Sequence, residues 1–580
     1  MLDFSLTLVC FFKKNPNFFD IKIMMNKQIV LCILVFCSDL CWAKLFPIEY
    51  RIPLSGKIPE PGTPWPKPQL SISNHFRFSI DPSQFVLSSN IDSESCIVMR
   101  EAMHRYREII LNDVNYRPAP FHLLITNVFV YVSDDSRCGY PPEDMREEYW
   151  IEIPHPEQNN QIWITARSIW GALRGLETLS QLIYSDEKSH LFVNSTRIYD
   201  FPRYQFRAIL LDSARHFLPK KTLLANLDAM SMNKFNVFHW HLVDDQSFPI
   251  ELKSYPNISR YGAYSSKHIY RSEDVQEIIE FARMRGIRVI PELDTPGHTH
   301  AMAQALPNLL TPCYGDGMNP YTPNYPFFSK SEILNPMLNQ SFDFMRELYK
   351  EFRENFKDDY IHLGMDEVSY DCWKSNPEIN RFIRSRNWKN LNQLEQYYVQ
   401  RTILNIRDVG YKYLMYQDPV DNGVSLANDS IVVVWKDRSL DSGMDKWQNY
   451  IKNVAQKGYR IILSACWYLN YINYPYPGMD WEKYYLCDPK NFDGTEKEKN
   501  LVIGGEACLW GEFVDGTNLI ARLWPRASAV AERLWSDPTQ TQDVDSARHR
   551  LDQHRCRMVR RGIPASPILN GFCGDYDWDL

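Results

Sequence analysis

Eight short apolar segments, separated by longer amphipathic segments, dominate the chain after residue 206. They cover residues 207–211, 236–243, 287–293, 360–363, 413–416, 431–435, 460–464 and 501–504. Apolar residues recur at helical spacing between most of them, for example over residues 220–232, 272–284 and 391–408. Buried strands joined by crossover helices form a parallel sheet, and eight such strands close a (β/α)8 barrel. The sequence therefore predicts an α/β fold with a TIM barrel.

A smaller α/β region is expected before the barrel. A Pro-rich entry at residues 58–68 precedes strand patterns at 121–132, 149–153 and 161–165, and residues 167–183 have helical spacing. At roughly 150 residues per domain, the 580-residue chain has room for both units. We predict an upstream extension and signal peptide at residues 1–43, an N-terminal α/β domain at 44–202 and the barrel at 203–580.

The first 43 residues have the features of a secretory leader. Residues 29–37 form an apolar run between Lys27 and a small and polar stretch that ends at Ala43. A run of about nine residues is too short to span a bilayer and fits the hydrophobic part of a signal peptide. We expect a functional start at Met24 or Met25, cleavage near Ala43 and no stable membrane insertion. The alternative is a short signal anchor.

Sequons and cysteines fit the same route. Four N-x-S/T sequons follow the leader, at Asn194, Asn257, Asn339 and Asn428, and are candidate glycosylation sites. Four of the 13 cysteines lie in the leader, which leaves nine. Because nine is odd, at least one thiol is unpaired or pairs with another chain. The sequence thus predicts a glycoprotein of the secretory pathway.

The predicted strands end in polar and aromatic residues. In a barrel these ends converge on one face, where the loops after the strands build the active site. A single strand-end acid often only caps the next helix, but acids or aromatics follow nearly every strand. They are Asp212, Asp244, Asp245, Asp294, Asp366, Glu367, Gln417, Asp418, Trp435, Trp467, Tyr468, Glu506, Trp510 and Glu512. We therefore expect a pocket lined by carboxylates and Trp.

The net charge, the residue types and the absence of certain motifs restrict the classes of function that the chain could have. The net charge of −7 does not suit a nucleic-acid partner. The hallmark motifs of serine hydrolases, zincins and P-loop proteins are absent from the sequence. Carboxylates with aromatic walls suit glycoside hydrolysis, in which an acid protonates the leaving oxygen and sugar faces stack on Trp. Metal binding by His239 and His241 with Asp294 or His298 is the alternative, although such histidines more often form hydrogen bonds inside a barrel.

The adjacent acids Asp366 and Glu367 do not fit the usual glycosidase scheme. Neighbours on a strand point to opposite faces, so the two carboxyl groups cannot simply face each other across a glycosidic bond. Either one of them is structural, or the strand end bends and one carboxylate assists something other than direct attack.

Five motifs of the chain are distinctive: WGALRGLET at residues 170–178, HWHLVDD at 239–245, DTPGHT at 294–299, HLGMDEV at 362–368 and GGEACLWGE at 504–512. Together they resemble family 20 glycoside hydrolases, and most closely the animal β-N-acetylhexosaminidases of the lysosomal type. The resemblance implies an N-terminal α/β domain with an antiparallel sheet, followed by a catalytic (β/α)8 barrel. It also implies substrate-assisted retaining catalysis, in which the 2-acetamido oxygen of the sugar is the nucleophile.

The resemblance assigns a role to each candidate residue. Glu367 would be the general acid and base, Asp366 would orient the acetamido group, and Tyr468 would hydrogen-bond its oxygen. The other expected substrate-binding or supporting residues are Arg207 and Glu512 for the sugar hydroxyls, Asp244 and His298 beside the acid, Tyr416, Trp435 and Trp510 as aromatic walls, Trp467 near the acetamido pocket, and Asn470. No cofactor and no metal are expected.

Two positions depart from the family pattern. Met365 stands where the family has a second Gly before Asp366, so the position of Asp366 is in question. Tyr416, Gln417 and Asp418 stand where the family has Trp-Gln-Glu. We expect altered specificity rather than loss of activity. The alternative is a lectin-like relative that binds sugar without turnover.

The resemblance also suggests how the cysteines pair. It implies disulfides Cys96–Cys138, Cys313–Cys372 and Cys556–Cys573. For the remaining three, a Cys466–Cys487 pair with Cys508 free and buried is the prediction, supported only by parity. The resemblance further suggests a homodimer, in the lysosome or secreted. The natural glycan would be selected by loops such as residues 309–334 and 470–481.

Overall fold

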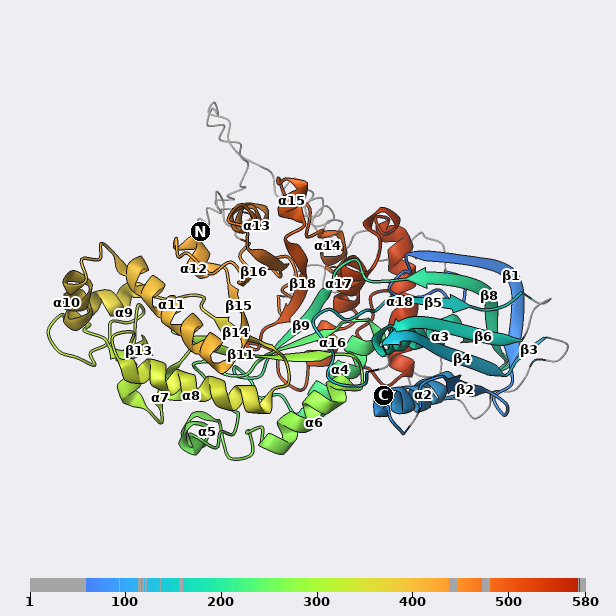
Figure 1. Ribbon diagram of the computed structural model, residues 1–580, viewed down its shortest axis with the longest axis horizontal. Coiled ribbons are helices and arrows are strands. Elements are labelled where there is room, and N and C mark those ends of the chain that lie inside the picture. Colours follow the sequence, from blue (N-terminus) through green and yellow to red (C-terminus); the bar gives the residue numbers. More distant parts are fainter. Residues whose placement is uncertain are drawn as a thin grey trace, which may run out of the picture. The chain divides into compact units, whose positions relative to one another are not determined.

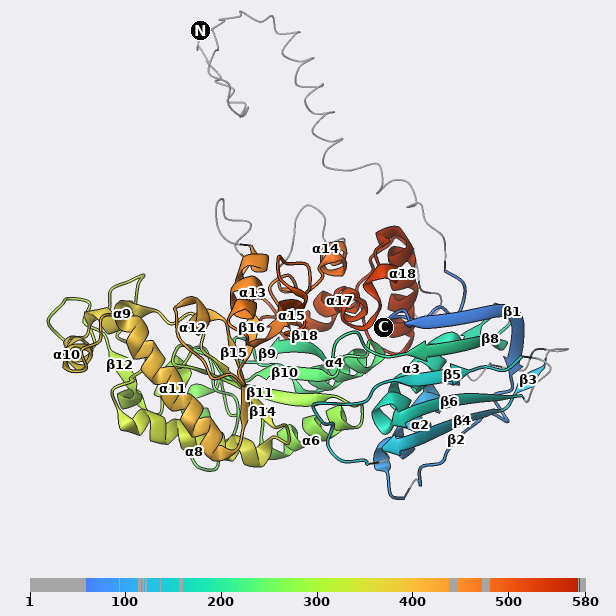
Figure 2. The ribbon, with the colours of Figure 1, turned by 45° about the horizontal axis from the view of Figure 1, so that its top comes forward.

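The computed structural model describes residues 59–573 except 93, 113–115, 117–118, 120–122, 136, 156–159, 438–445, 472–479 and 572. The predicted extension and signal peptide at residues 1–43 lie outside this range. Two large sheets organise the described residues (Figures 1 and 2). None of the described helices combines the length and the apolar character needed to cross a membrane.

The predicted barrel is confirmed. Eight strands close on themselves, and each pairs with its neighbours in parallel. They are β9 (Phe206–Asp212), β10 (Val237–His241), β11 (Arg288–Thr295), β14 (Tyr360–Gly364), β15 (Lys412–Tyr416), β16 (Ile431–Val434), β17 (Arg460–Leu463) and β18 (Val502–Leu509). Side chains alternate along each strand. In β9, Ala208 and Leu210 belong to the cluster inside the barrel, whereas Ile209 and Leu211 belong to the larger cluster shared with the helices.

Helices alternate with the barrel strands. The longer ones are α4 (Lys220–Met232), α6 (Ser272–Arg283), α8 (Asn339–Asn355), α11 (Leu391–Val409), α13 (Trp447–Gln456), α17 (Arg526–Trp535) and α18 (Val544–Arg560). Shorter elements decorate the loops: α5 (Pro256–Gly262), α7 (His300–Ala303), η2 (Pro307–Leu309), α9 (Tyr370–Ser375), α10 (Pro377–Ser385), α12 (Asp418–Asp421), α14 (Trp481–Leu486), α15 (Glu496–Lys499), α16 (Leu519–Leu523), η3 (Pro538–Gln540), and the hairpin of β12 (Leu310–Pro312) and β13 (Ser331–Leu334).

The N-terminal sheet is mixed, which corrects the expectation of an antiparallel sheet. Its strands are β1 (Leu70–Ile80), β2 (Val86–Ser89), β3 (Leu124–Ile125), β4 (Asn127–Asp135), β5 (Tyr149–Glu152), β6 (Gln161–Ser168), β7 (Tyr184–Ser185) and β8 (Leu191–Asp200). They lie in the order β2-β4-β6-β5-β8-β1-β3, with β7 beside β8. The pairs β5–β6, β5–β8, β1–β8 and β7–β8 are antiparallel, whereas β2–β4, β4–β6 and β1–β3 are parallel. Helix α2 (Ile97–Ile110) intervenes between β2 and β4, and a crossover of this kind returns a chain to the same direction.

Helix α3 (Ile169–Leu182) joins the N-terminal domain to the barrel. Ser168 caps its N-terminus, and every residue of the helix is buried. Its Arg174 donates to Glu147 and to the backbone oxygens of Arg285 and Gly286, just before β11. Trp535 of α17 completes the apolar core of the N-terminal domain.

Residues 140–147, here called the floor segment, contact the amino ends of the barrel strands. The Tyr140 hydroxyl accepts from Val289 N–H on β11 at 2.6 Å. Glu143 pairs with Lys412 of β15 and Arg460 of β17 and accepts from the Tyr360 hydroxyl of β14. Glu147 binds Arg207 at the start of β9, at 2.6 Å. The floor segment thus covers the end of the barrel opposite to the loops that follow the strands.

The predicted disulfides are confirmed. The bonded pairs are Cys96–Cys138, Cys313–Cys372, Cys466–Cys487 and Cys556–Cys573, and Cys508 is a free, buried thiol on β18. The sequons lie in different settings. Asn257, Asn339 and Asn428 are exposed, whereas Asn194 is half-buried in β8 and accepts a hydrogen bond from the Tyr184 hydroxyl.

Candidate active site

The two adjacent acids lie just beyond the carboxyl end of β14, in a tight bend. Gly364, Met365 and Glu367 all have positive φ, at 67°, 72° and 49°. The bend turns the two acids into different surroundings: the Asp366 side chain is only 12% exposed, whereas that of Glu367 is 60% exposed. Of the two interpretations of this pair, the structure supports the bent strand end.

Gly364 is required for this bend. A Cβ atom on it would lie 1.7 Å from the Asp294 carboxylate, so no other residue fits without moving that side chain. The space that the glycine leaves lets Asp294 Oδ1 accept the N–H of Met365 at 3.1 Å. The Met365 side chain is buried in the cluster between strands and helices. It therefore does not occupy the site, and Asp366 stays at the strand end.

His298 gathers the acids of three strands. Its Nδ1 lies 3.1 Å from Asp244, and its Nε2 lies 3.8 Å from Asp294, 3.9 Å from Asp366 and 3.8 Å from Glu367. Burial lowers the pKa of His298, but Asp294, Asp244 and Asp366 outweigh it and hold the pKa well above its ordinary value. The ring is therefore a cation at the centre of the carboxylates.

Two buried carboxyl groups share this environment. Burial raises the pKa of Asp366 to about 6, and the Asp418 carboxylate adds to it, whereas His298 opposes it. Burial and the neighbouring Asp366 raise the pKa of Asp294 well above its usual range. Two carboxylates this close repel each other, which disfavours the state in which both are ionised. Asp366 Oδ1 is buried and has no hydrogen-bond partner among the described residues.

Three aromatic rings form a wall beside the acids. The Tyr468 ring lies 6.4 Å from Trp435 and 6.5 Å from Trp510, between centroids. The Trp435 indole N–H donates to Asp418 at 2.8 Å, which fixes its orientation. Backbone hydrogen bonds of Trp467 and Leu469 with Cys508 hold the Tyr468 segment on β18. Trp435, Tyr468 and Trp510, predicted at three strand ends, are thus brought together.

A profile of glycosyl hydrolase family 20 catalytic domains matches residues 204–538, and a "beta-acetyl hexosaminidase like" profile matches residues 64–182. The chain belongs to glycosyl hydrolase family 20. It is 42% identical over 518 residues to mouse beta-hexosaminidase subunit alpha, which covers 88% of this chain and 94% of the mouse protein. Cat beta-hexosaminidase subunit beta is 44% identical over 496 residues, covering 84% and 89%.

Solved structures of the family superpose on the chain. Flavobacterium johnsoniae chitobiase matches with a TM-score of 0.72 and 29% identity, over 86% of this chain and 73% of that one. An exo β-N-acetylglucosaminidase from Vibrio harveyi, solved with N-acetylglucosamine, matches with a TM-score of 0.73 and 22% identity, over 89% and 80%. At that identity the second likeness concerns the fold alone.

The structure does not bring Arg207 to the family 20 site. Arg207 lies at the start of β9, at the floor of the barrel, where Glu147 and three backbone carbonyls occupy its guanidinium. The prediction that it holds sugar hydroxyls is therefore wrong. Arg215, which the sequence analysis missed, lies beyond the carboxyl end of β9. It pairs with Asp212 at 3.1 Å and Asp244 at 2.8 Å, and its guanidinium lies over Trp510.

Two predicted aromatic residues lie behind the wall. Trp467 is fully buried, and its indole N–H donates to the backbone of Tyr484, so it supports the site from behind. Tyr416 is also buried, and its hydroxyl donates to Glu292 at 3.3 Å, below the pocket. Asn470 and Glu512 border the site: Asn470 Oδ1 is buried without a partner among the described residues, and Glu512 is exposed beside Arg215.

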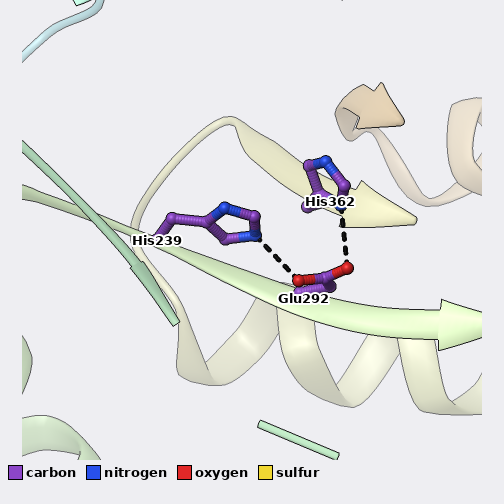
Figure 3. Close-up of side chains that lie close together, drawn as sticks. All are labelled: His239, Glu292 and His362. Atoms are coloured by element: carbon purple, nitrogen blue, oxygen red, sulfur yellow. Dashed lines mark ion pairs between the residues drawn. The ribbon is translucent and has the colours of Figure 1, made fainter. Parts of the chain in front are cut away.

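A buried network of His and Glu fills the barrel interior. Glu292 lies 3.0 Å from His239, 3.1 Å from His362 and 2.8 Å from His241 (Figure 3 shows the first two pairs). His239 also binds Glu506, and His241 binds Asp244 at 2.9 Å, which links the network to His298.

The protonation of this network tests the alternative that His239 and His241 bind a metal ion. Burial lowers the pKa of His239 and of His241, but carboxylates outweigh it and raise both to about 10. A metal ligand must be a neutral imidazole. The raised pKa values of these two histidines therefore favour a role as hydrogen-bonded cations over a role as metal ligands.

Proposed function

We propose that this chain is an exo-acting β-N-acetylhexosaminidase. It would release terminal, non-reducing β-linked N-acetylglucosamine and N-acetylgalactosamine from glycoconjugates, with retention of configuration. The names of its relatives support this class of reaction. The observation that carries the proposal is the divergence of Asp366 and Glu367, one buried and one exposed, around the same protonated His298.

The geometry suits substrate-assisted catalysis. Glu367, exposed toward the substrate side, donates its proton to the glycosidic oxygen as the bond to C1 breaks. The acetamido oxygen of the same sugar attacks C1, which gives a cyclic oxazolinium ion. The Asp366 carboxylate accepts a hydrogen bond from the acetamido N–H and stabilises the positive ring. Glu367 then takes a proton from the water that attacks C1, and the configuration is retained.

The remaining side chains bind the sugar. The Tyr468 hydroxyl donates to the acetamido oxygen, while Trp435 and Trp510 enclose the acetamido group and the ring. Arg215 and Glu512 hold the sugar hydroxyls, in place of the pair Arg207 and Glu512. Asp244 and Asn470 complete the set, Asp244 by fixing His298.

The proposal also covers the compartment, glycosylation, substrate and assembly of the protein. The four disulfides fit an oxidising compartment, in agreement with entry into the secretory pathway and with lysosomal or secreted enzyme. The exposed sequons Asn257, Asn339 and Asn428 are the best placed for glycosylation. An oligosaccharide or glycoconjugate is the substrate, and a homodimer is the proposed assembly.

Release of a chromophore from an aryl β-N-acetylglucosaminide, from acidic to neutral pH, tests the proposal. Glu367→Gln removes the acid and base, and we expect kcat/KM to fall by about 10²–10⁴-fold. A thiazoline mimic of the oxazolinium ion is expected to inhibit the wild type. Glu277→Gln, on the exposed side of α6, is the matched control and should keep full activity. No turnover by folded wild type, with sugar binding retained, would favour the lectin-like alternative instead.

A further inference from the structure

Glu367 lies in a loop with an uncommon backbone conformation. Residues 365–369, here called the acid loop, join β14 to α9, and Met365 and Glu367 within it have φ of 72° and 49°. Side chains in this left-handed region persist only where the surrounding structure holds the backbone firmly. The Met365 N–H donates to Asp294, and the Glu367 N–H donates to Asp418 at 3.2 Å. The place of Glu367 therefore depends on what fixes Asp418 and the far end of the acid loop.

One buried carboxyl group, that of Glu395 on α11, is linked to both. Glu395 is only 1% exposed. It accepts a hydrogen bond from the hydroxyl of Tyr370, the residue that follows the acid loop and begins α9. It also accepts from the side-chain amide of Asn422 at 3.0 Å. Asn422 directly follows α12, and its N–H donates to the carbonyl of Asp418, the first residue of that helix.

Helix α11 is a firm base for these contacts. It runs for 19 residues and ends at Gly410, which has the left-handed conformation that closes a helix. A second side chain of α11, that of Asn392, donates to the carbonyl of Asn422 at 2.6 Å. The Tyr370 ring stacks on Trp373, with centroids 5.7 Å apart and planes 11° apart. Because the ring is packed in this way, its hydroxyl can be removed while the packing stays.

We propose that Glu395 is a positioning residue for the general acid, and that it holds the acid loop through α9 and α12 so that Glu367 stays against the glycosidic oxygen. The inference rests on the proposed function and deepens it. Glu395 is buried and acts through Tyr370 and Asn422 rather than on the substrate. A misplacement of about 1 Å near a reacting centre can cost about 10²-fold in rate. An acid matters most when the leaving oxygen is basic, so the loss should grow with the basicity of the leaving group.

Two aryl N-acetyl-β-glucosaminides that share the terminal sugar test this role. Phenolate leaves poorly without a proton, whereas dinitrophenolate needs little protonation. We expect Tyr370→Phe and Glu395→Ala to lower kcat/KM for the phenyl glycoside by about tenfold and that for the dinitrophenyl glycoside by less than about twofold. Burial raises the pKa of Glu395 to about 7, so at acidic pH it is a neutral acid. Glu395→Gln resembles that acid, since it can accept from Asn422 and donate to the Tyr370 oxygen, and should restore most of the ratio.

Glu351→Ala is the matched control. Glu351 is a buried acid of α8 that accepts the backbone N–H groups of Lys253 and Ser254. Its loss should lower stability but leave the ratio of the two kcat/KM values at that of wild type. The double variant with Tyr370→Phe and Glu395→Ala should lose no more on the phenyl glycoside than Glu395→Ala alone, because both changes break the same link.

The outcomes separate this inference from the proposed function. An unchanged ratio in Tyr370→Phe and Glu395→Ala, equal losses on both substrates, or losses that add in the double variant would overturn the positioning role while leaving the hydrolase intact. Wild type that cleaves neither substrate, or Glu367→Gln that loses both equally, would overturn the proposed function itself. If Glu395→Ala does not fold, Tyr370→Phe and Glu395→Gln decide the question, since both keep the packing of the buried residues.

Discussion

Met365 has a backbone conformation that side chains usually avoid. Its φ of 72° lies in the left-handed region, which costs an L-residue roughly 1–2 kcal/mol relative to glycine. Its side chain nevertheless packs in the apolar cluster around the barrel. Truncating a buried Met costs about 2–5 kcal/mol, so burial outweighs strain at this position.

Met365→Gly is therefore expected to destabilise the protein, by about 1–3 kcal/mol, even though it relieves the strained backbone. Denaturant unfolding measures the change. Met365→Ala is the matched variant: it loses the side chain but keeps the strain, so it should be no more stable than Met365→Gly. A glycine variant more stable than wild type would show that strain dominates instead.

At the scale of single residues, the sequence predicted which kinds of side chain form the site better than it predicted where each side chain lies. Asp366, Glu367, Tyr468, Trp435 and Trp510 follow strand ends and meet as expected. Arg207 and Arg215 flank the same strand, and only the end at which each lies decides which one reaches the site. Tyr416 was predicted as a wall and Trp467 only as a neighbour of the pocket. Both are buried behind the wall, because an aromatic residue at a strand end can turn inward as well as toward the ligand.

Strand β10 shows what the period of an element can and cannot predict. His239 and His241 lie two apart, so they point to the same face of the strand, while Trp240 packs outward. Their partners Glu292 and Glu506 come from β11 and β18, which no local pattern connects. Strand β18 itself extends to Leu509, beyond the predicted end at Gly504. Gly504 and Gly505 therefore lie inside the strand and do not end it. Glycine is needed at both positions, because Phe206 and the Trp467 ring leave no room for a Cβ atom.

The histidines of β10 predict a pH dependence of stability. Their pKa rises from 6.5 to about 10 on folding, because Glu292 contacts both, Glu506 contacts His239, and Asp244 and Asp212 face His241. Their contribution is therefore complete below about pH 6.5 and is lost as the pH rises toward 10. We expect the melting temperature to fall by at least about 2 °C between pH 6.5 and 9.

Scanning calorimetry of wild type and His241→Gln checks this dependence. The variant should melt at a lower temperature than wild type at pH 6 and should lose less on going to pH 9. His190→Gln, at a turn of the N-terminal domain, is the control and should follow wild type. A wild-type melting temperature that is flat over this range would contradict the assignment of buried cations.

At the scale of the whole molecule, a buried ion pair between Glu147 and Arg207 joins the two domains. Glu147 of the floor segment binds Arg207 of the barrel and Arg174 of α3, and all three side chains are at most 2% exposed. The two domains were predictable from sequence as separate patterns. The contact between the two domains was not predictable, since it depends on Arg174 and Arg207, which lie 27 and 60 residues from Glu147 in the sequence.

Glu147→Ala leaves two buried guanidinium groups without their carboxylate. We expect the free energy of unfolding to fall by about 3–5 kcal/mol, as for other broken buried pairs. Glu152→Ala removes an exposed partner of Arg197 in the same domain and should change it by less than about 1 kcal/mol. Similar losses in the two variants would mean that the buried pairs do not hold the joint.

The floor segment has a consequence for how such an enzyme can diversify. It ties five barrel strands together at the end away from the mouth, so the interactions that secure the scaffold share few residues with those that recognise the glycan. Insertions and exchanges in the loops at the mouth, including residues 309–334, can therefore accumulate under selection for a new sugar while the scaffold stays intact. The residues of the substrate pocket and those of the scaffold can therefore evolve at different rates.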